Sequence, residues 1–268
     1  MKNNSFFTLA NGVQIPAIGF GTWQIPSGDV AYNSVREAIK AGYRHIDTAQ
    51  AYGNEADVGR AVIDSGIARN EIFVTSKLPA EIKRYEKAVR HAEITMKNIG
   101  LDYIDLYLIH APWPWTEIGA DYTKENIEVW KAMEEFYERG KTRSVGISNF
   151  NVKDTEAILE NCRIRPMVNQ IKMHIGHRQA EIAEFCQKNN ILIEGYSPLA
   201  TGKILGNSEI ARIAAKYGKS VAQLSVRYVL QKGALPLPKS VHPEYIRQNF
   251  DINFEISDDD IRLLDALK

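Results

Sequence analysis

The chain has 268 residues, of which 44% are hydrophobic, and its 33 basic and 33 acidic side chains cancel to a net charge of zero at pH 7. That length can bury the core of one large domain, and the balanced charge argues against nucleic acid or an anionic membrane as a partner. No stretch approaches the roughly 20 apolar residues of a membrane helix, and the N-terminus shows no secretory signal, so we expect a soluble cytoplasmic protein.

Short apolar or β-branched runs alternate with amphipathic helical segments along the whole chain. The first expected element is a hairpin over 6–17, because Asn11-Gly12 suits a two-residue primed turn. Strands are then expected at 17–20, 43–46, 72–77, 104–110, 143–148, 167–172, 191–197 and 234–239. Helices between them include 31–42, 55–66, 85–100, 125–140 and 178–189.

Eight mostly apolar strands separated by helices predict a parallel sheet covered by helices. In a chain of this length, a (β/α)₈ barrel fits the strand count better than an open doubly wound sheet. The hairpin would close the bottom of that barrel. No low-complexity segment or Gly/Ser linker interrupts the sequence, so we expect a single domain over 1–268.

Four ionisable side chains follow the ends of expected strands, where the active sites of such barrels lie. They are Asp47, Tyr52, Lys77 and His110. Each alone has an ordinary explanation, since a strand-end lysine is usually an ion-pair or surface residue and a lone histidine a hydrogen-bonded core residue. Four such groups directed at one barrel mouth favour catalysis.

These four residues together suit acid catalysis on an oxygen atom. A phenol with a pKa near 10 is a poor proton donor at neutral pH, but a neighbouring ammonium lowers that pKa. We therefore expect Tyr52 to be the general acid, with Lys77 and Asp47 as its tuning pair. His110 can donate a second hydrogen bond to the same oxygen. The set suits protonation of an oxygen that becomes an alcohol while hydride reaches its carbon.

Seven segments occur in the order found in one enzyme family: GFGTW (19–23), GYRHIDTAQAYGNE (42–55), LDYIDLYLIH (101–110), VGISNF (145–150), VNQ (168–170), YSPL (196–199) and LPKSV (237–241). With these segments the sequence resembles the aldo-keto reductases over essentially its full length. The resemblance implies a (β/α)₈ barrel that reduces aldehydes or ketones with NADPH and without a metal. It implies Tyr52 as the proton donor, Asp47 and Lys77 as its supporting pair, and His110 as the residue that orients the carbonyl.

The resemblance also implies cofactor contacts, since no GxGxxG motif supports a Rossmann site. Ser148, Asn149 and Gln170 match the residues that hold the nicotinamide amide, and Tyr196 matches the ring that stacks on it. A phosphate site after the last two strands is common in barrels. The further expected contacts are Gly21, Thr22, Trp23 and Asp47 near the first two strands, Ser197, Leu199, Gly202 and Lys203 after the seventh, and Lys239, Ser240, Gln248 and Asn249 after the eighth.

Three departures from the family pattern bear on specificity. Tyr245 and Gln248 stand where many members have Arg and Glu, which removes a cation near the 2′-phosphate, so we expect NADPH with NADH as a weaker substitute. Ala111 replaces a tryptophan that often follows the histidine. The sequence ends without the long C-terminal loop of larger members.

An open, partly aromatic substrate cleft is therefore expected, lined by Trp23, Tyr52, His110 and Trp113. Such a cleft suits small reactive aldehydes such as methylglyoxal, or keto sugar acids. We expect the protein to act on these small carbonyl compounds as a monomer.

Other functions rest on weaker patterns. A metal-dependent hydrolase could use His45 and Asp47, or His174 and His177, but neither pair has a credible third ligand, and strand alternation is expected to turn His45 away from Asp47. A retaining glycosidase needs two carboxylates about 5 Å apart, and Glu194 has no partner at a strand end. A cofactor-binding sensor or interaction subunit with negligible turnover stays open, and turnover on a simple aldehyde would separate it from an enzyme.

Overall fold

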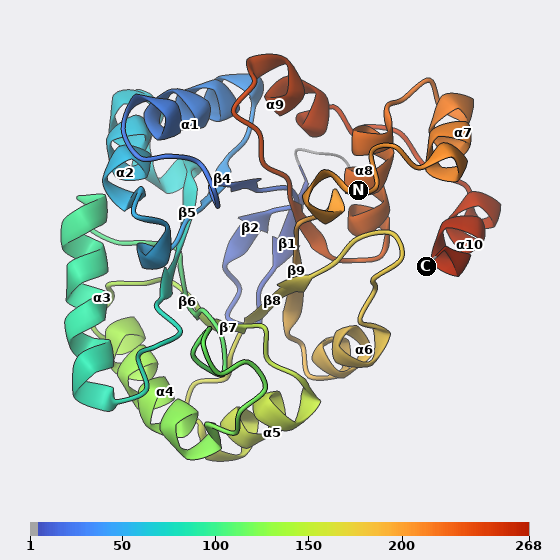
Figure 1. The fold of residues 1–268 in the computed structure, drawn as a ribbon. Helices are drawn as coiled ribbons and strands as arrows, with labels where there is room; N and C mark the ends of the chain where they lie inside the picture. Colours follow the sequence, from blue (N-terminus) through green and yellow to red (C-terminus); the bar gives the residue numbers. More distant parts are fainter. Residues whose placement is uncertain (1–4, 268) are drawn as a thin grey trace.

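The computed structural model describes residues 5–267, in which eight parallel strands form a barrel with helices on its outside (Figure 1). The remaining residues of the predicted domain, 1–4 and 268, lie outside the described residues. Each strand pairs in parallel with the next one along the chain, which confirms the predicted barrel. The strands are β3 (Phe20–Gly21), β4 (His45–Asp47), β5 (Phe73–Leu78), β6 (Leu106–Ile109), β7 (Val145–Ser148), β8 (Val168–Lys172), β9 (Leu192–Tyr196) and β10 (Leu235–Leu237).

The barrel closes between its first and last strands, β3 and β10. The backbone N–H of Gly19 donates to the carbonyl of Pro236 at 3.1 Å, and that of Gly21 donates to Pro238 at 3.0 Å. Proline has no N–H, so β10 returns no hydrogen bond at these two positions. This one-sided seam explains why β3 is only two residues long and starts later than the strand expected at 17–20.

Helices surround the barrel and carry the chain back to the start of each next strand (Figure 1). The five expected helices begin and end within two residues of the observed ones. No helix in the described part of the chain is both long and apolar enough to cross a membrane. The helices are α1 (Asp29–Ala41), α2 (Glu55–Asp64), α3 (Tyr85–Ile99), α4 (Thr123–Glu138), α5 (Val152–Asn161), α6 (Ala180–Lys188), α7 (Ser208–Lys216), α8 (Val221–Gln231), α9 (Pro243–Phe250) and α10 (Asp258–Ala266).

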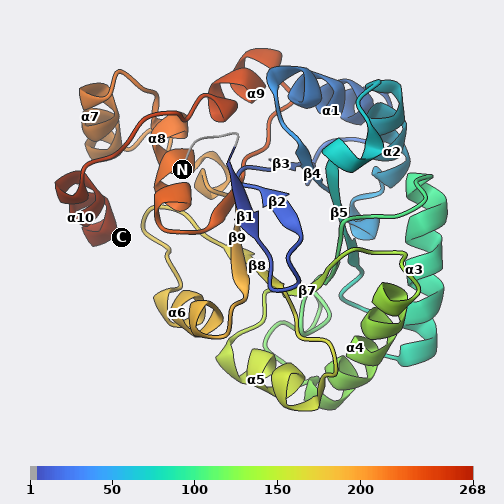
Figure 2. The ribbon, with the colours of Figure 1, turned by 180° about the vertical axis from the view of Figure 1, so that it is seen from behind.

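The predicted hairpin lies across the end of the barrel at which the strands begin (Figure 2). It consists of β1 (Phe6–Thr8) and β2 (Gln14–Pro16), paired antiparallel. The Asn11 side chain donates to the carbonyl of Arg143, just before β7, at 2.9 Å. The hairpin therefore covers the end opposite to the one where strand-end side chains meet.

The turn of this hairpin is not the two-residue primed turn that the sequence predicted. The N–H of Leu9 donates to the carbonyl of Val13 at 2.9 Å, which leaves three residues in the loop. Within the loop Gly12 has a positive φ of 84°, and its N–H donates to the carbonyl of Leu9. This is the three-residue hairpin loop, a type I turn followed by a left-handed residue.

Helices α2 and α3 touch at Gly59, where a side chain has no room. A Cβ added there would lie 1.7 Å from the carbonyl oxygen of Ile99. Replacing a helical glycine by alanine usually stabilises a protein by about 1 kcal/mol. A loss of stability in Gly59→Ala would therefore indicate a steric clash at this contact. We expect Gly59→Ala to lower the free energy of unfolding by about 1–3 kcal/mol, as overpacking does, in guanidinium denaturation.

Gly206→Ala is the matched control, because nothing lies within 4 Å of a Cβ added at that exposed position. Its effect should stay within about 0.5 kcal/mol. A Gly59→Ala variant more stable than the unmutated protein would contradict the close contact between α2 and α3.

Candidate active site

A cavity of about 1090 Å³ opens at the ends of the barrel strands opposite the hairpin. Its lining comes from the ends of most of the strands and the loops after them, from the start of α8 and from α9. The predicted site residues that line it are Gly21, Trp23, Asp47, Tyr52, His110, Ser148, Asn149, Gln170, Tyr196, Ser197, Leu199, Gly202, Lys239, Ser240, Gln248 and Asn249.

Three predicted contact residues are not part of this lining. Thr22 is buried, and its Oγ1 donates to the main-chain oxygen of Asp47 at 3.0 Å. Trp113 packs edge-on against Trp115, with 5.2 Å between ring centroids, and Trp115 takes the place at the cavity wall. Lys203 is the third. The expected tryptophan wall therefore exists, but Trp115, two residues further along the loop, faces the cavity in place of Trp113.

Lys77 lies at the centre of the site, beneath the cavity wall, with a fully buried side chain. Its Nζ donates to Asp47 Oδ1 at 2.7 Å, to the main-chain oxygen of Thr48 at 2.8 Å and to Tyr52 Oη at 3.3 Å. Asp47 and Lys77 meet because β4 and β5 are neighbours. Asp47 pairs with Thr75, and Lys77, two residues later, points to the same side of the sheet.

The electrostatics keep both Lys77 and Tyr52 protonated. Burial by itself would lower the pKa of Lys77, but Asp47 and Tyr52 outweigh it and raise that pKa above the ordinary value. Burial raises the pKa of Tyr52, and the charge of Lys77 offsets this only in part. The net direction is thus opposite to the lowered pKa that the sequence suggested, because a buried phenolate loses the water that would solvate it.

His110 stands beside the phenol, with its ring 5.5 Å from the Tyr52 ring, measured between centroids. Burial, and then the charge of Lys77, lower the pKa of His110 to about 3, so its imidazole is neutral at pH 7. A neutral imidazole still carries one N–H that can donate to a carbonyl oxygen. The main-chain oxygen of His110 accepts from Asn149 Nδ2 at 2.9 Å, which ties the strand end to the next loop.

Backbone strain gathers around the cavity. Seven non-glycine residues of the described chain have positive φ, and four of them, Gln24, Asn149, Ser197 and Thr201, line the cavity. Such residues are enriched at ligand sites because the surrounding structure must hold them. Asn149 is held on two sides: its Nδ2 also lies 3.0 Å from Ser148 Oγ, and its Oδ1 accepts from the hydroxyl of Tyr196 at 2.8 Å.

Gln170 connects the site to a buried carboxyl group deeper in the barrel. Its Nε2 donates to Asp47 Oδ2 and to Glu194 Oε2, both at 2.8 Å. With both amide protons used, the free hydrogen-bonding atom of Gln170 is its Oε1. Burial, and then the charge of Asp47, raise the pKa of Glu194 to about 8, so this carboxyl group is protonated at neutral pH.

His45 lies next to Glu194, with 3.8 Å between Nε2 and Oε1, and also contacts Thr75 Oγ1 at 2.9 Å. Burial lowers the pKa of His45 to about 3, so the pair is not an ion pair at pH 7. The expectation that strand alternation turns His45 away from Asp47 was wrong, because residues two apart in a strand share a face. The described residues contain no group of three His, Cys, Asp or Glu placed to hold a metal ion.

Some lining residues could not have been recognised in the sequence. Trp113 and Trp115 both follow His110, and only the backbone path decides which ring reaches the cavity. Ser220 caps α8 through a reciprocal hydrogen-bond pair with Gln223, which is an ordinary helix start. It lines the cavity only because α8 begins beside the loop after β9.

Known proteins resemble this chain along nearly all of its length. A sequence model of the Aldo/keto reductase family matches residues 17–268. Glyoxal reductase from Bacillus subtilis is 43% identical over 260 residues, which cover 97% of this chain and 91% of that protein. The 9,11-endoperoxide prostaglandin H2 reductase from Trypanosoma cruzi is 40% identical over 269 residues, covering 99% and 92%. The crystal structure of an aldo/keto reductase from Brucella melitensis has a TM-score of 0.91 at 40% identity, covering 98% of this chain and 99% of that one.

The neutral Glu194 carboxyl group predicts a specific pH dependence of stability. Its pKa is about 8 in the folded protein against an ordinary 4.5, so the folded state keeps a proton that the unfolded state releases between these values. The stability contributed by the retained proton is complete below the ordinary pKa of 4.5, and it is lost as the pH rises through the folded-state pKa of about 8. Glu194→Gln should remove this loss, which is on the order of a few kcal/mol. The measurement is guanidinium denaturation of both proteins at pH 5 and pH 8, and parallel pH dependences would contradict a buried neutral Glu194.

Proposed function

The chain belongs to the Aldo/keto reductase family, and from this premise we propose that it reduces aldehydes and ketones to alcohols with NADPH, using Tyr52 as the general acid. The observation that carries the proposal is the contact of one buried ammonium, Lys77, with both Asp47 and Tyr52 at the floor of a large cavity. Stability alone gives no reason to bury that charge under a cavity wall, since burying an ion costs several kcal/mol before pairing.

The cavity suits a nicotinamide dinucleotide. Its volume of about 1090 Å³ lies at the upper end of small-molecule sites, which are typically about 300–1,000 Å³. The ring of Tyr196 offers a stacking surface, and the free Oε1 of Gln170 can accept from an amide group. Lys239 and Ser240 provide a cation and a hydroxyl for a phosphate. When bound there, the reduced nicotinamide would supply the hydride.

Tyr52 can donate its hydroxyl proton to the carbonyl oxygen of the substrate, because its raised pKa keeps the phenol protonated at neutral pH. The ammonium of Lys77, 3.3 Å from that oxygen, stabilises the phenolate left behind. Asp47 holds Lys77 charged and in place at 2.7 Å. His110 can add a second hydrogen bond to the same substrate oxygen without itself giving up a proton, which polarises the carbonyl.

Small reactive carbonyl compounds such as methylglyoxal, or keto sugar acids, are the proposed substrates. The cavity mouth is open, with Trp23 47% and Trp115 40% exposed. Few contacts would then form with remote parts of a substrate, which favours broad specificity and weak binding. The 43% identity to a glyoxal reductase supports small dicarbonyl compounds in particular.

Tyr52→Phe tests the role of the phenol. The variant keeps the ring but lacks the proton, so kcat should fall at least about 10²-fold, the usual contribution of a general acid. NADPH affinity should change little, since the hydroxyl serves the substrate oxygen. Turnover is followed by NADPH absorbance with methylglyoxal, and affinity by quenching of tryptophan fluorescence.

Tyr85→Phe at the start of α3 is the control for this test, since its hydroxyl donates to Glu135 and it does not line the cavity among the described residues. Near-normal turnover in Tyr52→Phe would rule out the assigned acid. Tight NADPH binding with negligible turnover in the unmutated protein would instead favour the sensor subunit.

Lys239→Ala tests the phosphate site. We expect NADPH to remain preferred over NADH, with a modest margin because exposed Tyr245 carries no charge. Arg247 does not replace that charge, since it pairs with Glu37 of α1 at 3.3 Å. Lys239→Ala should therefore weaken the binding of NADPH and leave the binding of NADH nearly unchanged. The measurement is the Kd of each cofactor, determined by quenching of tryptophan fluorescence.

Tyr245→Arg is the complementary variant and should widen the preference. The gain should be on the order of 1 kcal/mol, because a solvent-exposed charge is screened. Equal affinities for NADPH and NADH in the unmutated protein would show that Lys239 and Ser240 do not read the phosphate.

A further inference from the structure

Lys83, in the loop between β5 and α3, is a second buried ammonium, and it forms no ion pair within the described residues. It is 8% exposed, and its Nζ donates to the main-chain oxygen of Ala111 and to Asn126 Oδ1, both at 2.9 Å. Burial lowers the pKa of Lys83 to about 8, and Glu81, Asp154 and Glu125 act on it only at longer range.

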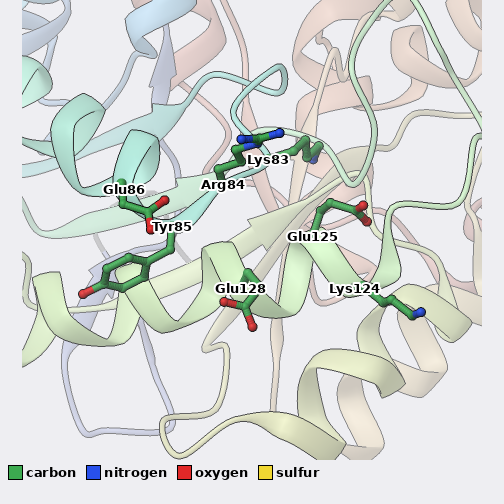
Figure 3. A pocket seen from close by; sticks show the side chains of 7 residues that line it. All are labelled: Lys83, Arg84, Tyr85, Glu86, Lys124, Glu125 and Glu128. Atoms are coloured by element: carbon green, nitrogen blue, oxygen red, sulfur yellow. The ribbon is translucent and has the colours of Figure 1, made fainter.

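The cost of this arrangement calls for a reason. Removing an ammonium from water without a paired carboxylate is expensive, and a hydrocarbon side chain of similar length would avoid the cost. Lys83 also lines a surface depression of about 260 Å³ between the starts of α3 and α4. Figure 3 shows the seven side chains that line it. That depression is lined by basic and acidic side chains alike, so its charges select no ligand. The ammonium of Lys83 instead points toward the protein interior, where it donates to the main-chain oxygen of Ala111.

Asn126 completes a clamp with Lys83. It is 2% exposed on α4, and while its Oδ1 accepts from Lys83, its Nδ2 donates to the main-chain oxygen of Pro112 at 2.8 Å. The two side chains therefore hold two consecutive carbonyl groups, those of Ala111 and Pro112. These are the first residues after His110, where the chain leaves the barrel.

The clamped segment leads directly to the cavity wall. Trp115 lines the cavity, and its ring stands perpendicular to that of His110 at 5.4 Å between centroids. Two of the four residues from Ala111 to Pro114 are prolines, whose rings fix φ. With so few free torsions between the clamp and the ring, the position of the clamp determines where Trp115 stands.

We propose that Lys83 and Asn126 are positioning residues for substrate selectivity, which act by holding Trp115 against His110 as the wall of the substrate cleft. The proposal rests on the proposed carbonyl reduction. A small dicarbonyl reaches Tyr52 and His110 without needing that wall. An aromatic aldehyde places its ring beyond the carbonyl, where Trp115 offers an exposed apolar surface.

The central test is the ratio of kcat/KM for benzaldehyde to that for methylglyoxal. Lys83→Met keeps the length of the side chain and removes its donors. KM for benzaldehyde should rise about tenfold, the equivalent of one lost hydrogen bond to a charged group. Values of kcat, and both constants for methylglyoxal, should stay within about twofold of the unmutated enzyme, because Asp47, Tyr52 and Lys77 are untouched.

Two further variants separate positioning from general destabilisation. Lys124→Met is the matched control: this exposed lysine lines the same depression (Figure 3) and should leave the ratio unchanged. Asn126→Asp keeps an acceptor for Lys83 and suits the first turns of α4, so it should fold even if Lys83→Met does not. It replaces the donor to Pro112 by an acceptor while the new carboxylate pairs with Lys83, so it loosens the Pro112 side of the clamp and should shift the ratio in the same direction.

A second readout needs no substrate. Acrylamide quenching of Trp115 fluorescence, taken as the difference from a Trp115→Phe protein, should increase in Lys83→Met. An unchanged ratio, or equal losses for both aldehydes, would overturn the proposal. Absence of turnover in the unmutated protein would contradict the proposed function instead. In that case the quenching experiment still tests the clamp, and unchanged quenching in the folded variants would show that Lys83 does not hold Trp115.

Discussion

A fully buried ammonium needs partners that stabilise its charge, and the candidate active site of this barrel is arranged around that requirement of Lys77. The ammonium donates one hydrogen bond to an oxygen of Asp47, a second to the main-chain oxygen of Thr48 and a third to the hydroxyl of Tyr52. The other oxygen of Asp47 is held by Gln170. The residues that keep the lysine charged are thus also the residues that shape the cavity floor, so charge and geometry cannot be changed separately.

The layer of side chains below this pair stays uncharged. Burial leaves Glu194 protonated and His45 neutral at pH 7, because neither has a partner that would stabilise its ion. The ionic interaction at this level of the barrel is therefore the Lys77–Asp47 pair. The proton on Glu194 is therefore part of the surroundings of Asp47, to which Gln170 connects it.

The fold followed from the sequence because it depends on local patterns, and the strand-end residues that the sequence singled out lie together at one cavity. Apolar runs and helical periods mark the elements, and strand ends mark the mouth. What failed depends on tertiary surroundings: the pKa of Tyr52 rises because of burial that no short segment reveals. The choice of Trp115 over Trp113 depends on how two carbonyl groups are held by Lys83 and Asn126, from segments separated by tens of residues. The Asn11-Gly12 pair was compatible with two turn types, and only the pairing of the flanking strands decides between them.

The one-sided seam between β3 and β10 has a consequence for the order in which the protein becomes competent. Asp47 to His110 all come from the first half of the chain, whereas the loops after β9 and β10 are made last during synthesis. Closing the seam joins segments more than 200 residues apart with hydrogen bonds from one side only, and such distant contacts are the slowest to form. The cavity wall shared by Gly21 and Lys239 exists only once the seam has closed. Under the proposed function, a nascent chain would therefore contain Tyr52, Lys77 and Asp47 well before it has a complete cavity for the dinucleotide, and tight cofactor binding would be a sign that folding has finished.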